Sequence, residues 1–185
     1  MPLRLVVMLL LLPTLAGAAS WGFDPGTAIT VDVPWRGGTA VVRFPPPTGS
    51  VDFDAAEPQA ARAVVRVSTG PATTGLGPVD LLLHGAGYLD SGRYPQITFQ
   101  LDRLVPLGPQ SAAVEGRITL RGVTRPVSFA ARVLRYGPVA GDPARFEAGF
   151  ELNGSLDRTE FGSTAGLPDI AAVLPVHIRL LMSSR

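Results

Sequence analysis

The chain of 185 residues contains no cysteine. Disulfides, thiolate catalysis and thiolate metal sites are therefore excluded. A lipoprotein anchor is excluded too, because it needs a cysteine after the cleavage site. Lysine is missing as well, since all 16 basic residues are arginines. A phosphate-binding loop of the Gly-Lys-Ser/Thr type therefore cannot exist in this chain.

Neither sign of charge dominates, since 16 basic residues face 15 acidic ones and no run of basic residues occurs. Nucleic acid is therefore not an expected partner, and charge-driven binding to anionic membranes is not expected either. The longest apolar run lies near the N-terminus and falls short of the roughly 20 residues that cross a bilayer. We expect no stable membrane insertion.

Histidine is scarce, and His84 and His177 are the only two. Neither is spaced for metal binding with another histidine or a carboxylate. The Gly-x-Ser-x-Gly and His-Glu-x-x-His motifs are also absent. We therefore expect no metal site, no cofactor and no catalytic residue, so the protein is not expected to be an enzyme. One alternative stays open, a hydrolase or isomerase for a hydrophobic substrate with either histidine as general base.

Glycine and proline are abundant, at 21 and 18 residues, and 46% of the chain is hydrophobic. This composition argues against disorder and favours many short strands separated by turns. The length suits a single domain that is large enough to bury a core. The composition therefore predicts an all-β domain.

The first 19 residues have the features of a secretory signal peptide. A single arginine, Arg4, precedes the apolar run from Leu5 to Leu12, and small residues follow. This order is typical of export signals. We expect cleavage near Ala18 or Ala19, a mature domain over residues 20–185, and a periplasmic or secreted location.

Apolar and polar residues alternate over most of the remaining chain, which is the pattern of strands that bury one face. Residues 54–62 are expected to form a loop or a helical turn, and one helical turn is expected within residues 167–174. About eight strands must hide their apolar faces, in a sandwich or a closed barrel. The expected strands cover residues 29–35, 39–44, 51–53, 63–67, 97–101, the hairpin arms within 116–133, 146–152 and 176–182.

The clearest pattern is a β-hairpin from Gly116 to Phe129, with the sequence Gly-Arg-Ile-Thr-Leu-Arg-Gly-Val-Thr-Arg-Pro-Val-Ser-Phe. Apolar residues alternate with polar ones in both arms. The residues from Gly122 to Thr124 are expected to connect the arms. Pro126 cannot donate a ladder hydrogen bond, so we expect it at the first position of the returning strand.

Three motifs resemble those of the YceI-like family. The hairpin is similar to that family's Gly-x-x-Thr-Leu-x-Gly-Val-Thr-Arg-Pro-Val signature. Residues Tyr94–Phe99 resemble its Tyr-Pro-x-Ile-x-Phe motif, and Arg158–Gly162 resembles its Arg-x-x-Phe-Gly motif. A partial match surrounds Asp80, where Leu82 replaces the family's histidine and Tyr88 its phenylalanine. This match implies a short helix here, with Asp80 as its N-cap. The motifs span most of the chain after the expected leader.

The resemblance implies an elongated, lipocalin-like antiparallel barrel of eight strands that holds a long-chain lipid. An eight-stranded barrel is just wide enough for side chains or for one ligand. Many positions expected to point inward are small, including Ala63, Ala131 and Ala148. They favour an unfilled channel that suits a long, flexible hydrocarbon. A filled barrel that acts as the partner of an envelope redox or membrane protein is the alternative.

The candidate ligand-binding residues are phenylalanines on apolar faces, two aliphatic residues, and one arginine that could meet a polar head group. They are Phe99, Phe129, Phe146, Phe150, Phe161, Val65, Leu120 and Arg158. We expect an exported, soluble protein that transports or sequesters an isoprenoid or quinone-like lipid, as a monomer or homodimer. No chemistry of its own is expected.

Overall fold

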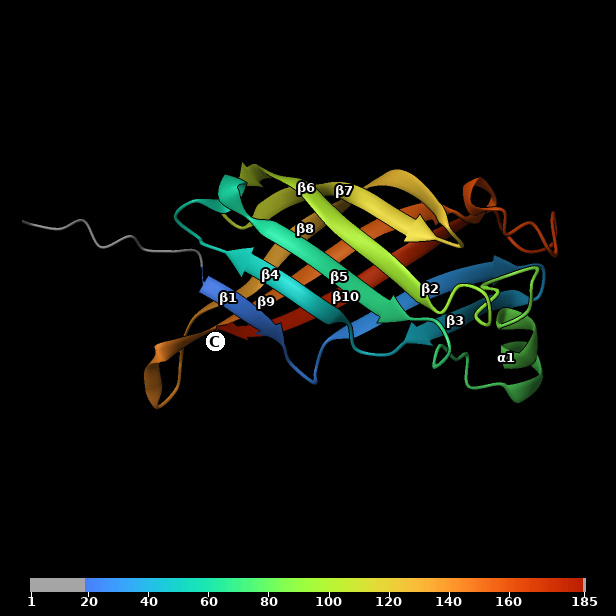
Figure 1. Cartoon of the computed structure of the whole chain (residues 1–185), viewed down its shortest axis with the longest axis horizontal. Helices are drawn as coiled ribbons and strands as arrows, with labels where there is room; N and C mark the ends of the chain where they lie inside the picture. Colours follow the sequence, from blue (N-terminus) through green and yellow to red (C-terminus); the bar gives the residue numbers. More distant parts are fainter. Residues whose placement is uncertain (1–18, 185) are drawn as a thin grey trace, which may run out of the picture.

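The computed structural model describes residues 19–184, so the expected signal peptide lies outside the described residues except for Ala19. The described chain forms ten strands, one α-helix and two short 3₁₀ helices (Figure 1). The helical elements are η1 (Pro58–Ala60), α1 (Gly77–Leu83) and η2 (Arg158–Phe161). The strands are β1 (Ala19–Phe23), β2 (Ala28–Trp35), β3 (Gly38–Phe44), β4 (Thr48–Phe53), β5 (Arg62–Ser68), β6 (Gln96–Gly108), β7 (Ser111–Leu120), β8 (Val123–Val139), β9 (Asp142–Asp157) and β10 (Val173–Ser184).

Eight of the strands form a closed antiparallel barrel in the order β1-β4-β5-β6-β7-β8-β9-β10, and pairing of β1 with β10 closes the ring. The expected all-β fold and eight-stranded antiparallel barrel are confirmed. β2 and β3 form a further hairpin beside β10. β10 pairs with β1 through residues 182–184 and with β2 through residues 176–179. The hairpin therefore lengthens the barrel wall at the end that carries α1 (Figure 1).

β6 and β8 continue beyond the ends predicted from the sequence, because a β-bulge interrupts the alternation of apolar and polar residues in each. The register of β6 against β7 shifts between Leu101 and Arg103, and that of β8 against β9 shifts between Val133 and Arg135. A bulge inserts one extra residue and reverses which positions face inward. The inward series of β6 therefore continues with Leu104, beyond the expected end of that strand.

The β7–β8 hairpin is present, but its connection is shorter than expected. Only Arg121 and Gly122 join the strands, and both have positive φ, 52° and 74°. Two successive left-handed residues are typical of hairpin turns whose twist matches the strands. The expectation that the connection reaches Thr124 is wrong, because Thr124 already pairs with β7.

Pro126 is not at the first position of the returning strand, because β8 begins at Val123. The strand tolerates it for a geometric reason. Hydrogen-bonded and non-bonded pairs alternate away from the turn, which directs the Pro126 nitrogen away from β7. On that other side β9 begins to pair with β8 only at Ala130, so no ladder bond is lost.

The helical turns differ in part from the expectations. η1 lies within residues 54–62 as expected. Asp80 is not an N-cap, because α1 begins at Gly77 and Asp80 lies inside it. Proline at position 78 explains the early start, since its fixed φ suits the first turn of a helix. Residues 167–174 contain no helix, and the helical turn of that region is η2.

The two ends of the barrel are built from different elements. The α1 end also holds the tip of the β2–β3 hairpin, the loop after η2 and the β7–β8 turn (Figure 1). Arg121 ties these parts together, because its guanidinium donates to the carbonyl oxygens of Ala86, Tyr88 and Phe161 at 2.8, 2.6 and 3.1 Å. The opposite end holds β1, the end of β10 and the β8–β9 hairpin.

Candidate functional site: a hydrophobic cavity inside the barrel

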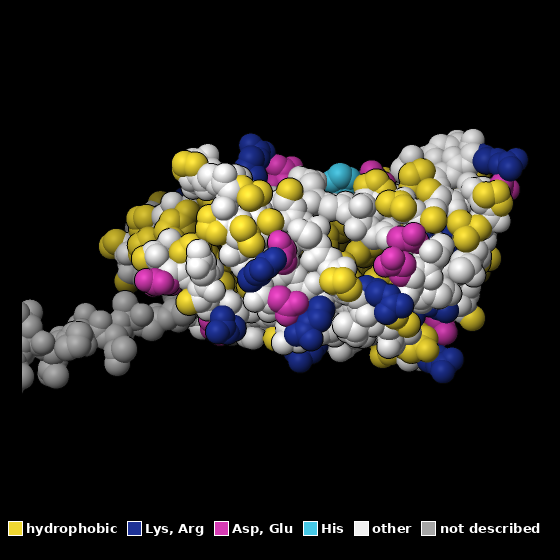
Figure 2. All heavy atoms as spheres, turned by 90° about the horizontal axis from the view of Figure 1, so that it is seen from above, with side chains coloured by type: hydrophobic (Ala, Val, Ile, Leu, Met, Phe, Trp, Pro, Cys, Tyr) yellow, Lys and Arg dark blue, Asp and Glu magenta, His cyan; other side chains and the backbone are white. Residues whose placement is uncertain are grey.

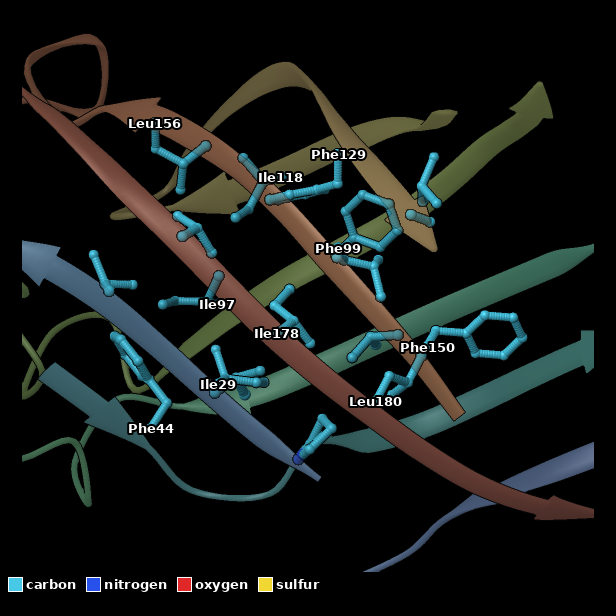
Figure 3. A pocket seen from close by; sticks show the side chains of 18 of the residues that line it. Ile29, Phe44, Ile97, Phe99, Ile118, Phe129, Phe150, Leu156, Ile178 and Leu180 are labelled. Atoms are coloured by element: carbon cyan, nitrogen blue, oxygen red, sulfur yellow. The ribbon is translucent and has the colours of Figure 1, made fainter. Parts of the chain in front are cut away.

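The barrel encloses an elongated cavity of about 800 Å³. This volume lies within the range of roughly 300–1,000 Å³ that is usual for small-molecule sites. Aliphatic and aromatic side chains from strands on all sides converge on it (Figure 3). On β10 every second residue from Leu174 to Met182 lines the cavity, a span of about 26 Å along the strand. The cavity therefore has the length and the apolar wall of a hydrocarbon site.

Two glycines shape the wall beside Phe99 and Phe129, whose rings lie 6.1 Å apart in an edge-to-face arrangement. A Cβ atom at Gly116 would approach the Phe99 ring to 2.6 Å, and one at Gly154 would approach the Phe129 ring to 2.6 Å. Both distances are far below normal van der Waals contact. The glycines therefore provide the space in which these two rings lie.

The cavity lining includes six of the eight predicted site residues. These are Val65, Phe99, Leu120, Phe129, Phe150 and Arg158. The other two are not among its lining residues. Phe146 packs beside Tyr136 with ring centroids 5.8 Å apart. Phe161 is buried against Ile118 and Leu120 beneath the wall.

Arg158 contributes the only charged side chain among the described residues that line the cavity. It is 4% exposed, and its guanidinium donates to the carbonyl oxygens of Ala171 at 2.8 Å, Ser163 at 2.8 Å and Ile170 at 3.0 Å. Burial lowers the pKa of Arg158 from its ordinary value, while the nearby Tyr88 and Asp157 act in the opposite direction. Three carbonyl oxygens thus fix this cation at the α1 end of the cavity.

An aromatic cluster occupies the opposite end of the barrel. The Trp21 indole donates to the carbonyl oxygen of Phe53 at 2.9 Å, and the Phe53 ring lies 6.0 Å from Phe150 and 6.3 Å from Tyr136. Trp21 is 2% exposed and belongs to a core cluster with Val51, Ala148 and Met182. Several residues that line the cavity at this end are nevertheless exposed, and they include Pro106, Pro109 and Tyr136, which is 43% exposed.

The cavity reaches the surface at the α1 end. Trp35, Leu76 and Leu82 line it, and yet they are 53%, 60% and 62% exposed. Trp35 lies at the tip of the β2–β3 hairpin, while the two leucines belong to α1 and its N-cap. We call this opening the mouth, and we define its rim by Trp35, Leu76, Val79 and Leu82.

Asp80 holds α1 in place at the mouth. Its carboxylate accepts hydrogen bonds from the Thr73 hydroxyl at 2.6 Å, the Thr74 N–H at 2.7 Å and the Thr74 hydroxyl at 2.6 Å. These hydrogen bonds lower the pKa of Asp80 to about 2. Thr73 in turn exchanges two backbone hydrogen bonds with Arg43 of β3, at 2.8 and 2.9 Å. Asp80 therefore links α1 to the edge of β3.

Neither histidine lines the cavity. The His84 Nδ1 lies 3.0 Å from the Ser91 hydroxyl. The His177 Nδ1 lies 2.7 Å from the Asn153 side-chain oxygen, and its Nε2 is 3.6 Å from Asp32. Within residues 19–184 no group of three or more His, Cys, Asp or Glu residues could hold a metal ion.

Sequence reasoning left out several parts of this site. Alternation within residues 29–35 and 39–44 predicted strands, but those strands were not assigned to the cavity wall. The sequence predicts α1 only as a short helix and assigns none of its residues to the cavity. The lining residues from these elements include Ile29, Val31, Val33, Val42, Phe44, Val79 and Leu83.

Among residues 19–184, no helix is long and apolar enough to cross a membrane.

Similarity to solved structures extends over the barrel. BcnA from Burkholderia cenocepacia superposes with a TM-score of 0.76 at 19% identity, covering 86% of this chain and 99% of that chain. A polyisoprenoid binding domain from Saccharophagus degradans, implicated in plant cell wall breakdown, gives a TM-score of 0.64 at 14% identity, covering 91% and 99%. At these identities the likeness shows a shared fold.

Sequence relatives are closer. UPF0312 proteins from Azotobacter vinelandii and Yersinia pestis are each 32% identical to this chain, over 115 and 120 residues. The matches cover 62% and 64% of this chain, and 58% and 60% of the relatives, so the chain spans less than two thirds of their length. The sequence model of the YceI-like domain matches residues 21–182, which is nearly the whole described chain. This protein belongs to the YceI-like family.

Proposed function

We propose that this protein binds a long-chain isoprenoid, or a related lipid such as a quinone, inside its barrel and carries or sequesters it outside the cytoplasm. The observation that carries the proposal is the elongated cavity of about 800 Å³, whose described lining contains one charged side chain. The expected signal peptide supports the location. The Saccharophagus degradans domain of the same fold is described as polyisoprenoid binding.

The energetics favour a hydrocarbon over a polar solute. Burial of one methylene group is worth about 0.8 kcal/mol. A chain of several isoprene units would gain affinity from the wall alone, without matched polar contacts. A polar solute would lose hydrogen bonds to water and find few partners in an apolar cavity.

We propose the cavity-lining residues Val65, Phe99, Leu120, Phe129 and Phe150 as contacts for the apolar tail. Arg158 is the proposed contact for a polar head group, because it is the charged residue of the lining. Phe146 and Phe161 have a different proposed role. They support the wall from outside the cavity, because they pack behind it.

The alternatives have less support. A filled barrel that serves only as a partner of an envelope redox protein does not fit an interior with this volume. A hydrolase or isomerase would need a histidine that faces the substrate cavity. His84 and His177 face other parts of the molecule, and His84 has a serine but no carboxylate within hydrogen-bond distance.

The test is to purify the protein without detergent and to analyse it by native mass spectrometry and by solvent extraction. We expect an added mass that solvent extraction recovers as a prenyl lipid. Protein that carries no lipid and also fails to bind added polyprenol in solution would contradict the proposed function.

A further inference from the structure

The exposed large hydrophobic side chains are concentrated at the mouth. Leu81 of α1 is 80% exposed, and beside it lie the exposed rim residues. Leu167, which is 42% exposed, lies in the loop that follows η2, and Val173, which is 51% exposed, begins β10 after that loop. This loop is joined to the tip of the β2–β3 hairpin, because Ala171 donates its N–H to the Pro34 carbonyl oxygen at 2.9 Å. An exposed apolar patch of this kind marks an interaction site.

The patch is continuous with the cavity wall. Leu76, Val79 and Leu82 face the cavity and the solvent at once. The partner that covers the patch is therefore the one from which a hydrocarbon could slide inward without crossing water. A bilayer offers such a hydrocarbon phase over its whole area, whereas a protein would need an apolar channel aligned with the mouth.

The charges around the mouth argue for an uncharged surface. Arg36 at the hairpin tip forms an ion pair with Asp169 at 2.6 Å, and the Asp80 carboxylate accepts hydrogen bonds from Thr73 and Thr74. The helix α1 has no basic residue in its last turn. Away from the mouth, on the long face seen in Figure 2, acidic and basic side chains likewise lie beside one another. We therefore expect no electrostatic attraction between the mouth and anionic lipid.

Trp35 fits the same partner. Its indole combines a large apolar body with one polar N–H, and tryptophan is enriched where membranes meet water. The other tryptophan, Trp21, is 2% exposed in the core at the opposite end. The fluorescence of Trp35 therefore reports on the mouth, and that of Trp21 reports on the core.

We propose that the mouth docks on the surface of a lipid bilayer by inserting Leu81, Leu82 and Trp35 among the acyl chains, independently of lipid charge. The inference rests on the proposed function for its purpose, which is exchange of an apolar ligand by direct contact. The docking itself is a separate physical event. It can be measured with vesicles that contain no prenyl lipid.

The experiment measures partition of the full chain into vesicles of phosphatidylcholine alone. We expect binding that does not fall when salt is raised from about 0.05 to about 0.5 M, since such salt screens charge but not apolar contact. Leu81→Ser should lower the partition coefficient about tenfold, because one leucine side chain is no longer buried in hydrocarbon. Leu107→Ser, which changes a 66% exposed leucine near the C-terminal end of β6 and outside the rim, is the matched control and should have no effect.

Fluorescence locates the contact. Dibrominated phosphatidylcholine should quench Trp35, and Trp35→Phe, which leaves only Trp21, should abolish the quenching. Binding that requires anionic lipid, or that Leu81→Ser and Leu107→Ser reduce equally, would overturn the inference. Absence of Trp35 quenching would overturn it as well. If the protein binds vesicles with quenching of Trp35 but does not bind polyprenol in solution, only the proposed function is refuted. If it binds polyprenol but Trp35 is not quenched, only the docking is refuted.

Discussion

Single residues decide how much of the barrel interior is empty. Phe150 is half-buried, lines the cavity and lies 6.0 Å from the Phe53 ring, whereas Phe129 is 5% exposed and its ring lies against Gly154, where an added Cβ atom would approach it to 2.6 Å. Two phenylalanines of the same wall thus have different surroundings. They should respond differently to the same enlargement.

Changing Phe150 to tryptophan should reduce lipid occupancy with little loss of stability, because the larger ring enters empty space. Changing Phe129 to tryptophan should destabilise the fold by about 1–3 kcal/mol, since the ring has no room beside Gly154. Thermal melting and native mass spectrometry of both variants measure the two effects. Unchanged lipid occupancy in Phe150→Trp would return that residue to an ordinary core role.

Arg158 has a structural role that does not depend on any ligand. Replacing it with methionine would leave the carbonyl oxygens of Ala171, Ser163 and Ile170 without their donors. We expect a loss of about 3 kcal/mol in the free energy of unfolding, from unsatisfied buried polar groups. Denaturant unfolding measures this loss. The control Arg125→Met removes an exposed arginine and should change stability by about 0.5 kcal/mol at most. Equal stability of both variants would contradict the role assigned to Arg158.

At the scale of elements, α1 depends on one carboxylate. The pKa of Asp80 is about 2 in the folded protein, below the ordinary value near 3.9 of an unfolded chain. A lowered folded pKa contributes stability that is fully present above pH 4 and is lost as pH falls through 2. Asp80→Asn should therefore melt at a lower temperature than the wild type at pH 6. The difference between the two should shrink between pH 4 and pH 2. A difference that is the same at pH 6 and pH 2 would show that Asp80 does not hold α1 through its charge.

Strands with one buried face, such as residues 146–152 and 176–182, can be predicted from the alternation of apolar and polar residues, because this alternation shows which face is buried. The prediction failed where local geometry changes the register. The bulges in β6 and β8 reverse the alternation, so the strands appeared to end early. The predicted start of α1 was wrong for another reason. The proline at position 78 favours an earlier start, so the helix begins before Asp80, the predicted N-cap.

The cavity wall could be predicted in part for a similar reason. Phe99 and Phe129 lie on strongly alternating strands, which fixes the direction of their side chains. Phe161 could not be placed this way, because it lies in a 3₁₀ helix and is buried behind the wall. The contributions of β2, β3 and α1 to the wall depend on how the barrel closes, and alternation carries no information on closure.

At the scale of the whole molecule, an apolar interior lies inside an exterior of balanced charge. Cross-strand ion pairs cover the outside, including Arg132 with Glu151 at 2.7 Å and Arg103 with Glu115 at 2.6 Å. Exposed pairs of this kind contribute little stability, about 0–1 kcal/mol each. They keep the outer face polar while the inner face stays hydrophobic. In the proposed function, the hydrophobic inner face binds the lipid and the polar outer face is in contact with water.

The most direct test of that function is a titration of the detergent-free, delipidated protein with polyprenols of increasing length. The affinity should rise by about tenfold or more with each isoprene unit, because each unit buries several carbon atoms. The rise should stop once the cavity of about 800 Å³ is full, and longer chains should bind no more tightly. An affinity that does not depend on chain length, or no binding at any length, would contradict the account.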